Sequence, residues 1–88
     1  MRQKLNVWNN AMEWKLPASV VATRMGNRVR TRRIEKEFGV AKVASAIGRS
    51  ETEMEAIEDG RDTLKAQEII TLCRIFDVPP SWFFDDLV

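Results

Sequence analysis

Apolar residues between positions 40 and 60 recur at the spacing of two short helices with a tight turn between them. The first predicted helix has one apolar face, made of Val40, Val43, Ala44 and Ile47. Steps of three and four residues place these side chains along one side of a helix. Gly48 follows directly, and glycine most readily adopts the left-handed conformation that ends a helix. The pattern therefore predicts a helix that starts at Val40 and stops at Gly48.

The second predicted helix starts with a capping pattern and has a single apolar face. Ser50 occupies the N-cap position, and Glu53 three residues later completes a capping box. Met54 and Ile57 supply the apolar face, and Gly60 ends the helix. Two helices joined by a turn that contains glycine form a helix-turn-helix, in which the second helix enters the DNA major groove.

The charges of this second helix conflict with a role in DNA binding. Residues 50–60 contain five acidic residues and no basic residue, whereas DNA is a polyanion whose binding depends on Lys and Arg. Charge is also distributed unevenly along the chain as a whole. Residues 1–48 carry ten bases and three acids, or +7, and residues 49–88 carry four bases and ten acids, or −6. This asymmetry indicates a charged partner or head-to-tail contact between copies.

Residues 1–16 predict an amphipathic helix, because every third or fourth residue is apolar. The apolar stripe is Leu5, Trp8, Met12 and Leu16. Trp14 lies off the stripe, and Pro17 interrupts the helix. Two alternatives stay open for this arm. It packs on the core of its own domain, or it forms a dimer or partner contact through Trp8 and Trp14.

The next pattern predicts a long helix over residues 19–37, with Ser19 as a possible cap. Four basic residues recur at every fourth position of this helix and form a stripe: Arg24, Arg28, Arg32 and Lys36. Between positions 24 and 37 bases outnumber acids six to two. The stripe is either a solvated face with occasional ion pairs or a surface that contacts phosphates, and the density of bases favours the second.

The C-terminal part predicts two further helices. The first runs from about Lys65 to Asp77, and an extended break over residues 78–80 follows it. Ser81 caps a last short helix over residues 82–87, whose apolar residues exceed what one face needs. These residues close the core, or they form a dimer or partner contact as well, through Pro80, Trp82 and Phe83.

Composition narrows the class of protein. The 88 residues suit one small domain, with an arm at 1–18 and a helix-turn-helix domain at 19–88. The chain has no His and a single Cys, Cys73, which removes the commonest general base, an internal disulfide and a cysteine-based zinc site. We therefore expect no enzyme, no metal, no cofactor and no small-molecule ligand. The chain lacks an apolar run of membrane length and a signal peptide, which predicts a cytoplasmic protein.

With these elements in place, the sequence resembles the phage-repressor or Cro-like helix-turn-helix regulators, also called the xenobiotic-response-element (XRE) family. The resemblance covers roughly residues 20–85 and is carried by Met25–Arg33, Val43-Ala44, Ile47-Gly48, Met54, Ile57–Gly60, Leu72–Val78 and Asp77–Phe84. It implies an all-α fold of five short helices, here with an extra N-terminal amphipathic helix, that acts as a dimer on a two-fold operator. It also implies that residues 50–59 form the recognition helix, and that Arg33 and Glu58 form a structural pair between two helices.

The sequence departs from the family where family members contact DNA. They often have Gln at the start of the first motif helix, and here the residue is Val40, which cannot donate a hydrogen bond. The expected DNA-contacting residues are the outer face of the second helix and the bases around it: Arg33, Lys42, Arg49, Ser50, Glu51, Thr52, Glu55, Ala56, Arg61 and Lys65.

Two functions stay open at this point. In the first, the chain is a small transcriptional regulator that binds double-stranded DNA as a homodimer. In the second, the helix-turn-helix (residues 40–60) has lost DNA binding, and its acidic helix binds another regulatory protein, as an anti-regulator or an antitoxin does.

Overall fold

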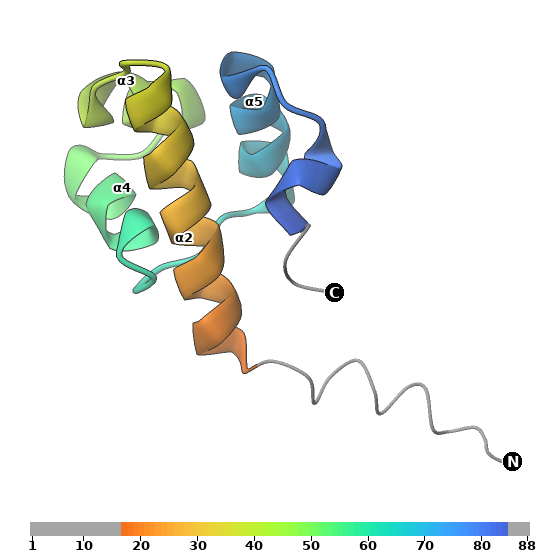
Figure 1. Cartoon of the computed structure of the whole chain (residues 1–88). Helices are drawn as coiled ribbons and strands as arrows, with labels where there is room; N and C mark the ends of the chain where they lie inside the picture. Colours follow the sequence, from red (N-terminus) through yellow and green to blue (C-terminus); the bar gives the residue numbers. More distant parts are fainter. Residues whose placement is uncertain (1–16, 85–88) are drawn as a thin grey trace, which may run out of the picture.

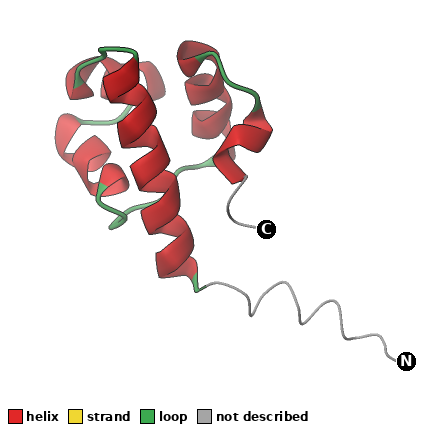
Figure 2. Ribbon diagram, in the orientation of Figure 1, coloured by secondary structure: helices red, strands yellow, loops and turns green. Residues whose placement is uncertain are grey.

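The computed structural model describes residues 17–84, and this part of the chain is all α-helical, as predicted. Figure 1 and Figure 2 show the arrangement. The elements are α2 (Ala18–Glu35), α3 (Val40–Ile47), α4 (Glu51–Glu58), α5 (Ala66–Phe76) and the 3-10 helix η1 (Pro80–Phe84). The expected N-terminal amphipathic helix, with Trp8 and Trp14, lies outside the described residues.

Helix α2 is the long central element, with α3 and α4 on one side of it in Figure 1 and α5 and η1 on the other. Each element contributes at least one side chain with no exposed surface to a shared core, among them Val29, Val43, Met54, Phe76 and Phe83. Burial of such side chains stabilises the fold by roughly 1.5–3 kcal/mol each. The core therefore fixes how α3 and α4 sit relative to the rest of the domain.

The first described helix differs in detail from the prediction. Its N-cap is Pro17, with no side-chain cap, so Ser19 lies inside the helix. It ends at Glu35, because Glu37 adopts a left-handed conformation with φ 61° and the Phe38 amide donates back to the carbonyl of Arg33. Sequence did not indicate this ending, because a Glu in this conformation is uncommon.

Two of the four residues of the basic stripe, Arg28 and Arg32, bind backbone carbonyls of other elements, while Arg24 is exposed. Arg28 donates from Nη1 to the carbonyl of Trp82 at 2.8 Å, and its guanidinium lies 5.4 Å from the centre of the indole ring. Arg32 donates from Nε to the carbonyl of Phe76 at 3.0 Å. These arginines join α2 to the end of α5 and to η1, where helix carbonyls lack partners within their own helix.

The last described element is a 3-10 helix over Pro80–Phe84, where an α-helix capped by Ser81 was expected; residues 85–87 of that expected helix lie outside the described residues. Ser81 lies inside the 3-10 helix, and the Trp82 amide donates to the carbonyl of Pro79 at 3.0 Å. The two prolines favour an early start, because each fixes φ near a helical value and neither needs an N–H partner. The resemblance predicted five helices. Residues 17–84 contain four α-helices, and the 3-10 helix η1 takes the place of the fifth.

Candidate nucleic-acid interface

Helix α4 is positioned by local contacts at its start. Gly48 ends α3 with φ 74°, which turns the chain sharply towards α4. The Ser50 hydroxyl accepts from the amide of Glu53 at 3.0 Å, and the Glu53 carboxylate accepts from the amide of Ser50 at 2.9 Å. This is the predicted capping box. It satisfies two amides, and it places a carboxylate at the positive end of the helix dipole.

The end of α4 is held by a buried ion pair with α2. Arg33 donates from Nε and Nη2 to the two carboxylate oxygens of Glu58, at 2.7 and 3.1 Å. Only 14% of the Arg33 side chain and 3% of the Glu58 side chain are exposed. The remaining Arg33 nitrogen, Nη1, donates to the carbonyl of Phe38 at 3.1 Å. Arg33 therefore fixes the angle of α4, and its guanidinium is engaged within the domain.

A second arginine of α2 reinforces the same end of α4. Arg30 donates from Nη2 to Asp59 at 2.6 Å and from Nε to Glu58 at 3.4 Å. Asp59 also accepts from Arg61 at 3.1 Å. Hydrogen bonds from Arg61 and Arg30 hold the pKa of the Asp59 carboxyl below its usual value. Two of the five acids of residues 50–60, Glu58 and Asp59, are thus paired with arginines of the same domain.

The outward face of α4 carries the remaining acids. Glu51, Thr52 and Glu55 are exposed, and Ala56 is half-buried. Glu51 and Glu55 are four residues apart and so lie on one side of the helix. The third exposed acid, Glu53, caps its own helix. Glu51 and Glu55 are therefore the outward acids of α4 for which the described residues show no structural contact.

Three bases from the surrounding elements are exposed: Lys42 on α3, Arg61 after α4, and Lys65 at the N-cap of α5. Lys42 lies over the ring of Phe38, with Nζ 4.1 Å from its centre. The aromatic face attracts this ammonium while one side of it stays in water. Arg61 has 67% of its side chain exposed, even though it also pairs with Asp59.

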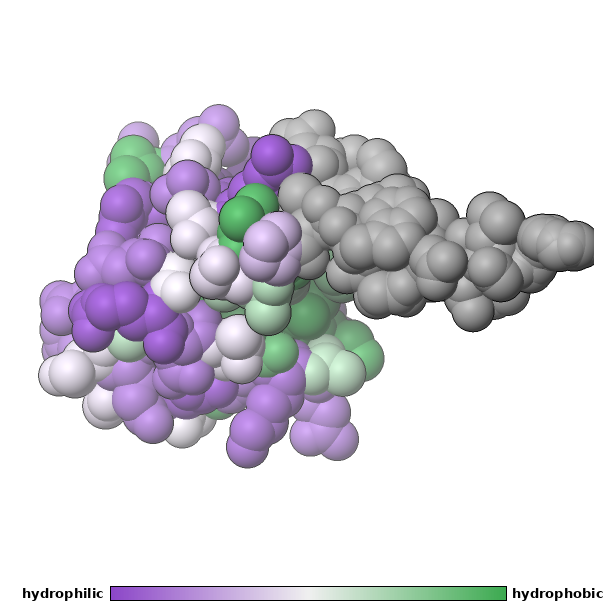
Figure 3. Space-filling view, turned by 90° about the horizontal axis from the view of Figure 1, so that it is seen from below, coloured by the Kyte–Doolittle hydropathy of each residue, from purple (hydrophilic) through white to green (hydrophobic). Residues whose placement is uncertain are grey.

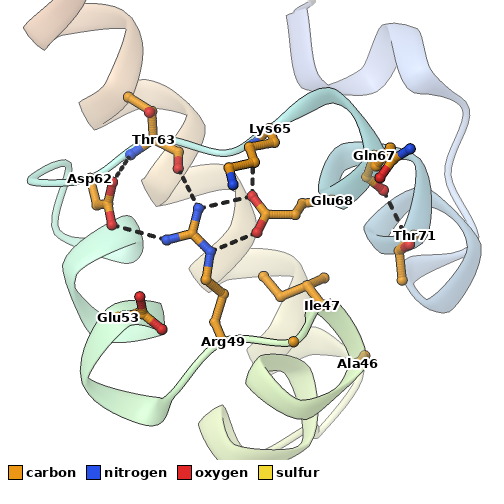
Figure 4. A pocket seen from close by; sticks show the side chains of 11 residues that line it. Ala46, Ile47, Arg49, Glu53, Asp62, Thr63, Lys65, Gln67, Glu68 and Thr71 are labelled. Atoms are coloured by element: carbon orange, nitrogen blue, oxygen red, sulfur yellow. Dashed lines mark hydrogen bonds and ion pairs between the residues drawn. The ribbon is translucent and has the colours of Figure 1, made fainter.

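Arg49 occupies a different place from the one expected, as Figure 4 shows. Its guanidinium donates to both oxygens of Glu68 at 2.6 and 2.9 Å, to Asp62 at 3.0 Å and to the carbonyl of Thr63 at 3.0 Å. Only 12% of its side chain is exposed. These contacts raise the pKa of Arg49 well above its ordinary value, chiefly through Glu68. Arg49 therefore joins the α3–α4 turn to α5, and its guanidinium is engaged within the domain.

Of the residues expected at a dimer or partner contact, some are buried in the core and others are accessible. Phe83 has no exposed surface and belongs to the core. Trp82 is half-buried against Phe76 and Phe83, with ring centres 6.5 and 5.0 Å away. Pro80 is exposed. Of the three, Pro80 and the open edge of Trp82 remain accessible for a contact.

Sequence reasoning missed several positions that hold this surface in place, among them Gly26, Arg30, Asp62 and Glu68. Glu68 had a local signal, because it lies three residues after Lys65 and accepts from the Lys65 amide at 2.7 Å. The others act across the fold and have no local signal. Among the described residues, no group of three or more His, Cys, Asp or Glu is arranged to hold a metal ion. No described helix is long and apolar enough to cross a membrane.

A family model described as "Helix-turn-helix domain" matches residues 24–81, which is more than half of the chain. The chain belongs to the helix-turn-helix domain family. The predicted resemblance to the XRE-type regulators is thereby confirmed. The match includes the whole of α3, the turn and α4, and also the two arginines of α2 that hold α4.

Two solved structures have the same fold as this helix-turn-helix domain. One is the restriction-modification controller protein C.AhdI from Aeromonas hydrophila, with a TM-score of 0.66, 22% identity, and coverage of 74% of this chain and 98% of that one. The other is the clp gene regulator ClgR from C. glutamicum, with a TM-score of 0.66, 17% identity, and coverage of 74% and 84%. No curated protein sequence matches the chain.

Proposed function

We propose that this helix-turn-helix protein is a small transcriptional regulator that binds double-stranded DNA as a dimer. The observation that carries the proposal is that α4 is held at both ends while its outer face is exposed to solvent. This helix is capped at Ser50, clamped to α2 through Glu58, and turned outward with Thr52 between two acids. The family match and the two regulators that share its fold support the same function.

In this proposal the contacts to phosphate come from the elements around α4 and not from α4 itself. Lys42, Arg61 and Lys65 are the exposed bases of the motif and its borders. Phosphate contacts position a protein on DNA, and base contacts give it specificity. On α4, Thr52 can contact a base edge, and Glu51 or Glu55 can accept a hydrogen bond from the N4 amino group of cytosine.

A fluorescence titration against its own promoter region and against random duplex, at two salt concentrations, tests this function. Each neutralised phosphate contributes about −0.9 to the slope of log affinity against log salt. Three bases in each protomer of a dimer therefore give a slope of about −5. Lys42→Ala and Lys65→Ala should each make the slope shallower, whereas Arg74→Ala, at an exposed base on α5, should not. Absence of binding at low salt would contradict the proposal.

One observation favours a second function, a protein-binding module. Helix α4 carries no base, and its outward carboxylates would suit a basic surface on another regulatory protein. Under this alternative, DNA does not bind even at low salt, and changing Glu51 and Glu55 to Gln abolishes capture of the partner. The same double change strengthens DNA binding under the first function, so this one variant separates the two functions.

A further inference from the structure

An apolar groove lies at the N-terminal end of α2, away from the outward face of α4. It has a volume of about 380 Å³, and its floor is formed by Val21, Ala22, Met25, Ile57 and Leu64. Figure 3 looks at this end of the domain from below and shows apolar surface gathered towards its right side, while the left side is mostly hydrophilic. The groove is open to solvent among the described residues, 17–84.

The size and lining of this groove indicate an occupant. Pockets that hold a compact apolar group typically measure roughly 300–1,000 Å³, and this groove falls within that range. Burial of apolar surface stabilises an association roughly in proportion to the area removed from water. Val21, Ala22, Met25 and Leu64 are each only half-buried, so a bound apolar group would cover more of all four.

The chain itself contains a matching apolar segment. Residues 1–16 precede α2 directly, and their sequence places Leu5, Trp8, Met12 and Leu16 on one helical stripe. A helix of this length would span about 24 Å, which is enough to cross the groove. Charge adds little to this match, because Asp62 beside the groove already pairs with Arg49.

We propose that residues 1–16 of one copy dock in this groove of a second copy, and so form an arm-exchanged dimer. The second copy is favoured because only Pro17 separates the arm from α2. Two antiparallel helices are normally joined by two to five residues, and Pro17 is extended, with φ −60° and ψ 151°. A connection too short to fold back on its own domain favours exchange with another copy. The proposal rests on the dimer of the proposed function but not on its DNA contacts.

Crosslinking between two different variants tests the exchange. One variant carries Met12→Cys on the arm, and the other carries Ala22→Cys in the groove. The native Cys73 is buried, and burial raises the pKa of its thiol, so it reacts slowly with maleimides. When the two variants are mixed and treated with a short bis-maleimide, we expect a covalent dimer as the main cross-linked product. The unsubstituted protein should give none.

The matched control replaces Ala22→Cys by Ser45→Cys, an exposed position on α3 that does not line the groove. Mixed with Met12→Cys, it should give at least tenfold less covalent dimer. If the doubly substituted chain, Met12→Cys with Ala22→Cys, links only within itself and the mixture gives no dimer, the arm covers its own groove and the proposal is overturned. Absence of any link in both samples means that the groove has another occupant, and this also overturns it.

Sedimentation velocity gives an independent measurement. Trp8→Ala on the arm and Ala22→Glu in the groove should each raise the dissociation constant of the dimer at least tenfold, with helix content checked by circular dichroism. An unchanged constant for both variants contradicts the exchange. If the dissociation constant is unchanged and the protein still binds DNA, the proposed function stands and the dimer forms through another surface. Failure of the arm exchange is therefore distinguishable from failure of the proposed function.

Discussion

Gly26 of α2 and the carbonyl of Ile57 in α4 are closer together than any residue with a β-carbon at position 26 would allow. A β-carbon there would lie 2.3 Å from the Ile57 oxygen and 2.7 Å from the oxygen of Glu58. These are backbone atoms, which cannot move aside as a flexible side chain can. A similar contact lies at Gly60, which has φ 80° and packs against Thr23. Two glycines therefore set how closely α4 approaches α2.

We expect Gly26→Ala to destabilise the protein by at least the roughly 1–3 kcal/mol that overpacking of a core costs. The added methyl group forces α4 away from α2 and strains the ion pair beside it. Urea denaturation measures the free energy of unfolding. The control is Gly39→Ser, because a β-carbon at Gly39 meets nothing within 4 Å and Ser is a good N-cap for α3. Equal stabilities of the two variants would contradict the close crossing.

The buried pair between Arg33 and Glu58 should be costly to break from one side. Glu58→Gln leaves the Arg33 guanidinium without its partner, and Arg33→Met leaves Glu58 with only the longer contact from Arg30. Breaking a buried ion pair from one side typically costs about 3–5 kcal/mol. Replacing both, as Arg33→Met with Glu58→Leu, removes the unpaired charge and should recover part of the loss. A double-mutant cycle from denaturation curves measures the coupling between them. Additive losses would show that the two side chains do not act as a pair.

Stability should fall in acid because of Glu68. A hydrogen bond from Arg49 is the main reason that its pKa lies below the ordinary value of 4.5. A carboxyl with a lowered pKa in the folded state stabilises the protein above its unfolded pKa, and this stabilisation is lost as pH falls through the folded pKa. Glu68→Gln should therefore cost roughly 1.5–3 kcal/mol near neutral pH, and its stability should converge with that of the unsubstituted protein below pH 4.5.

Denaturation midpoints measured from neutral to acid pH check this convergence. Arg49→Met should flatten the same part of the pH profile, because it removes the main cause of the lowered pKa. Parallel profiles for Glu68→Gln and the unsubstituted protein would show that the Arg49 contacts do not contribute to acid sensitivity.

The two outward acids of α4 should weaken DNA binding. Glu51→Gln with Glu55→Gln removes two negative charges from the face that meets the groove in the proposed function. Each such charge near a phosphate costs on the order of 1 kcal/mol in water. Removing two of them should therefore raise the affinity at low salt by about thirtyfold for each protomer. Fluorescence anisotropy with labelled duplex measures the change. Asp77→Asn, at an exposed acid after α5, is the matched control and should raise affinity much less.

The local features of the fold were predictable from sequence because they depend on neighbouring residues. The apolar spacing gave α3 and α4, Gly48 marked the turn, and Ser50 with Glu53 gave the capping box. The ends of α2 and η1 were less predictable, since a left-handed Glu37 and a proline-led 3-10 helix compete with ordinary helical patterns. The link between Arg33 and Glu58 came from family resemblance and not from spacing.

The sequence by itself determined the all-α class, the motif and the acidity of α4, because period, capping and composition are properties of short segments. Only the tertiary structure decided which charges face outward. Arg49 was expected from sequence to be a DNA-contacting base, but its guanidinium meets the carboxylates of Asp62 and Glu68, which lie further along the chain. The close crossing at Gly26 and the groove beside it were decided in the same way. Such contacts depend on how helices pack, and residue spacing along one helix does not contain that information.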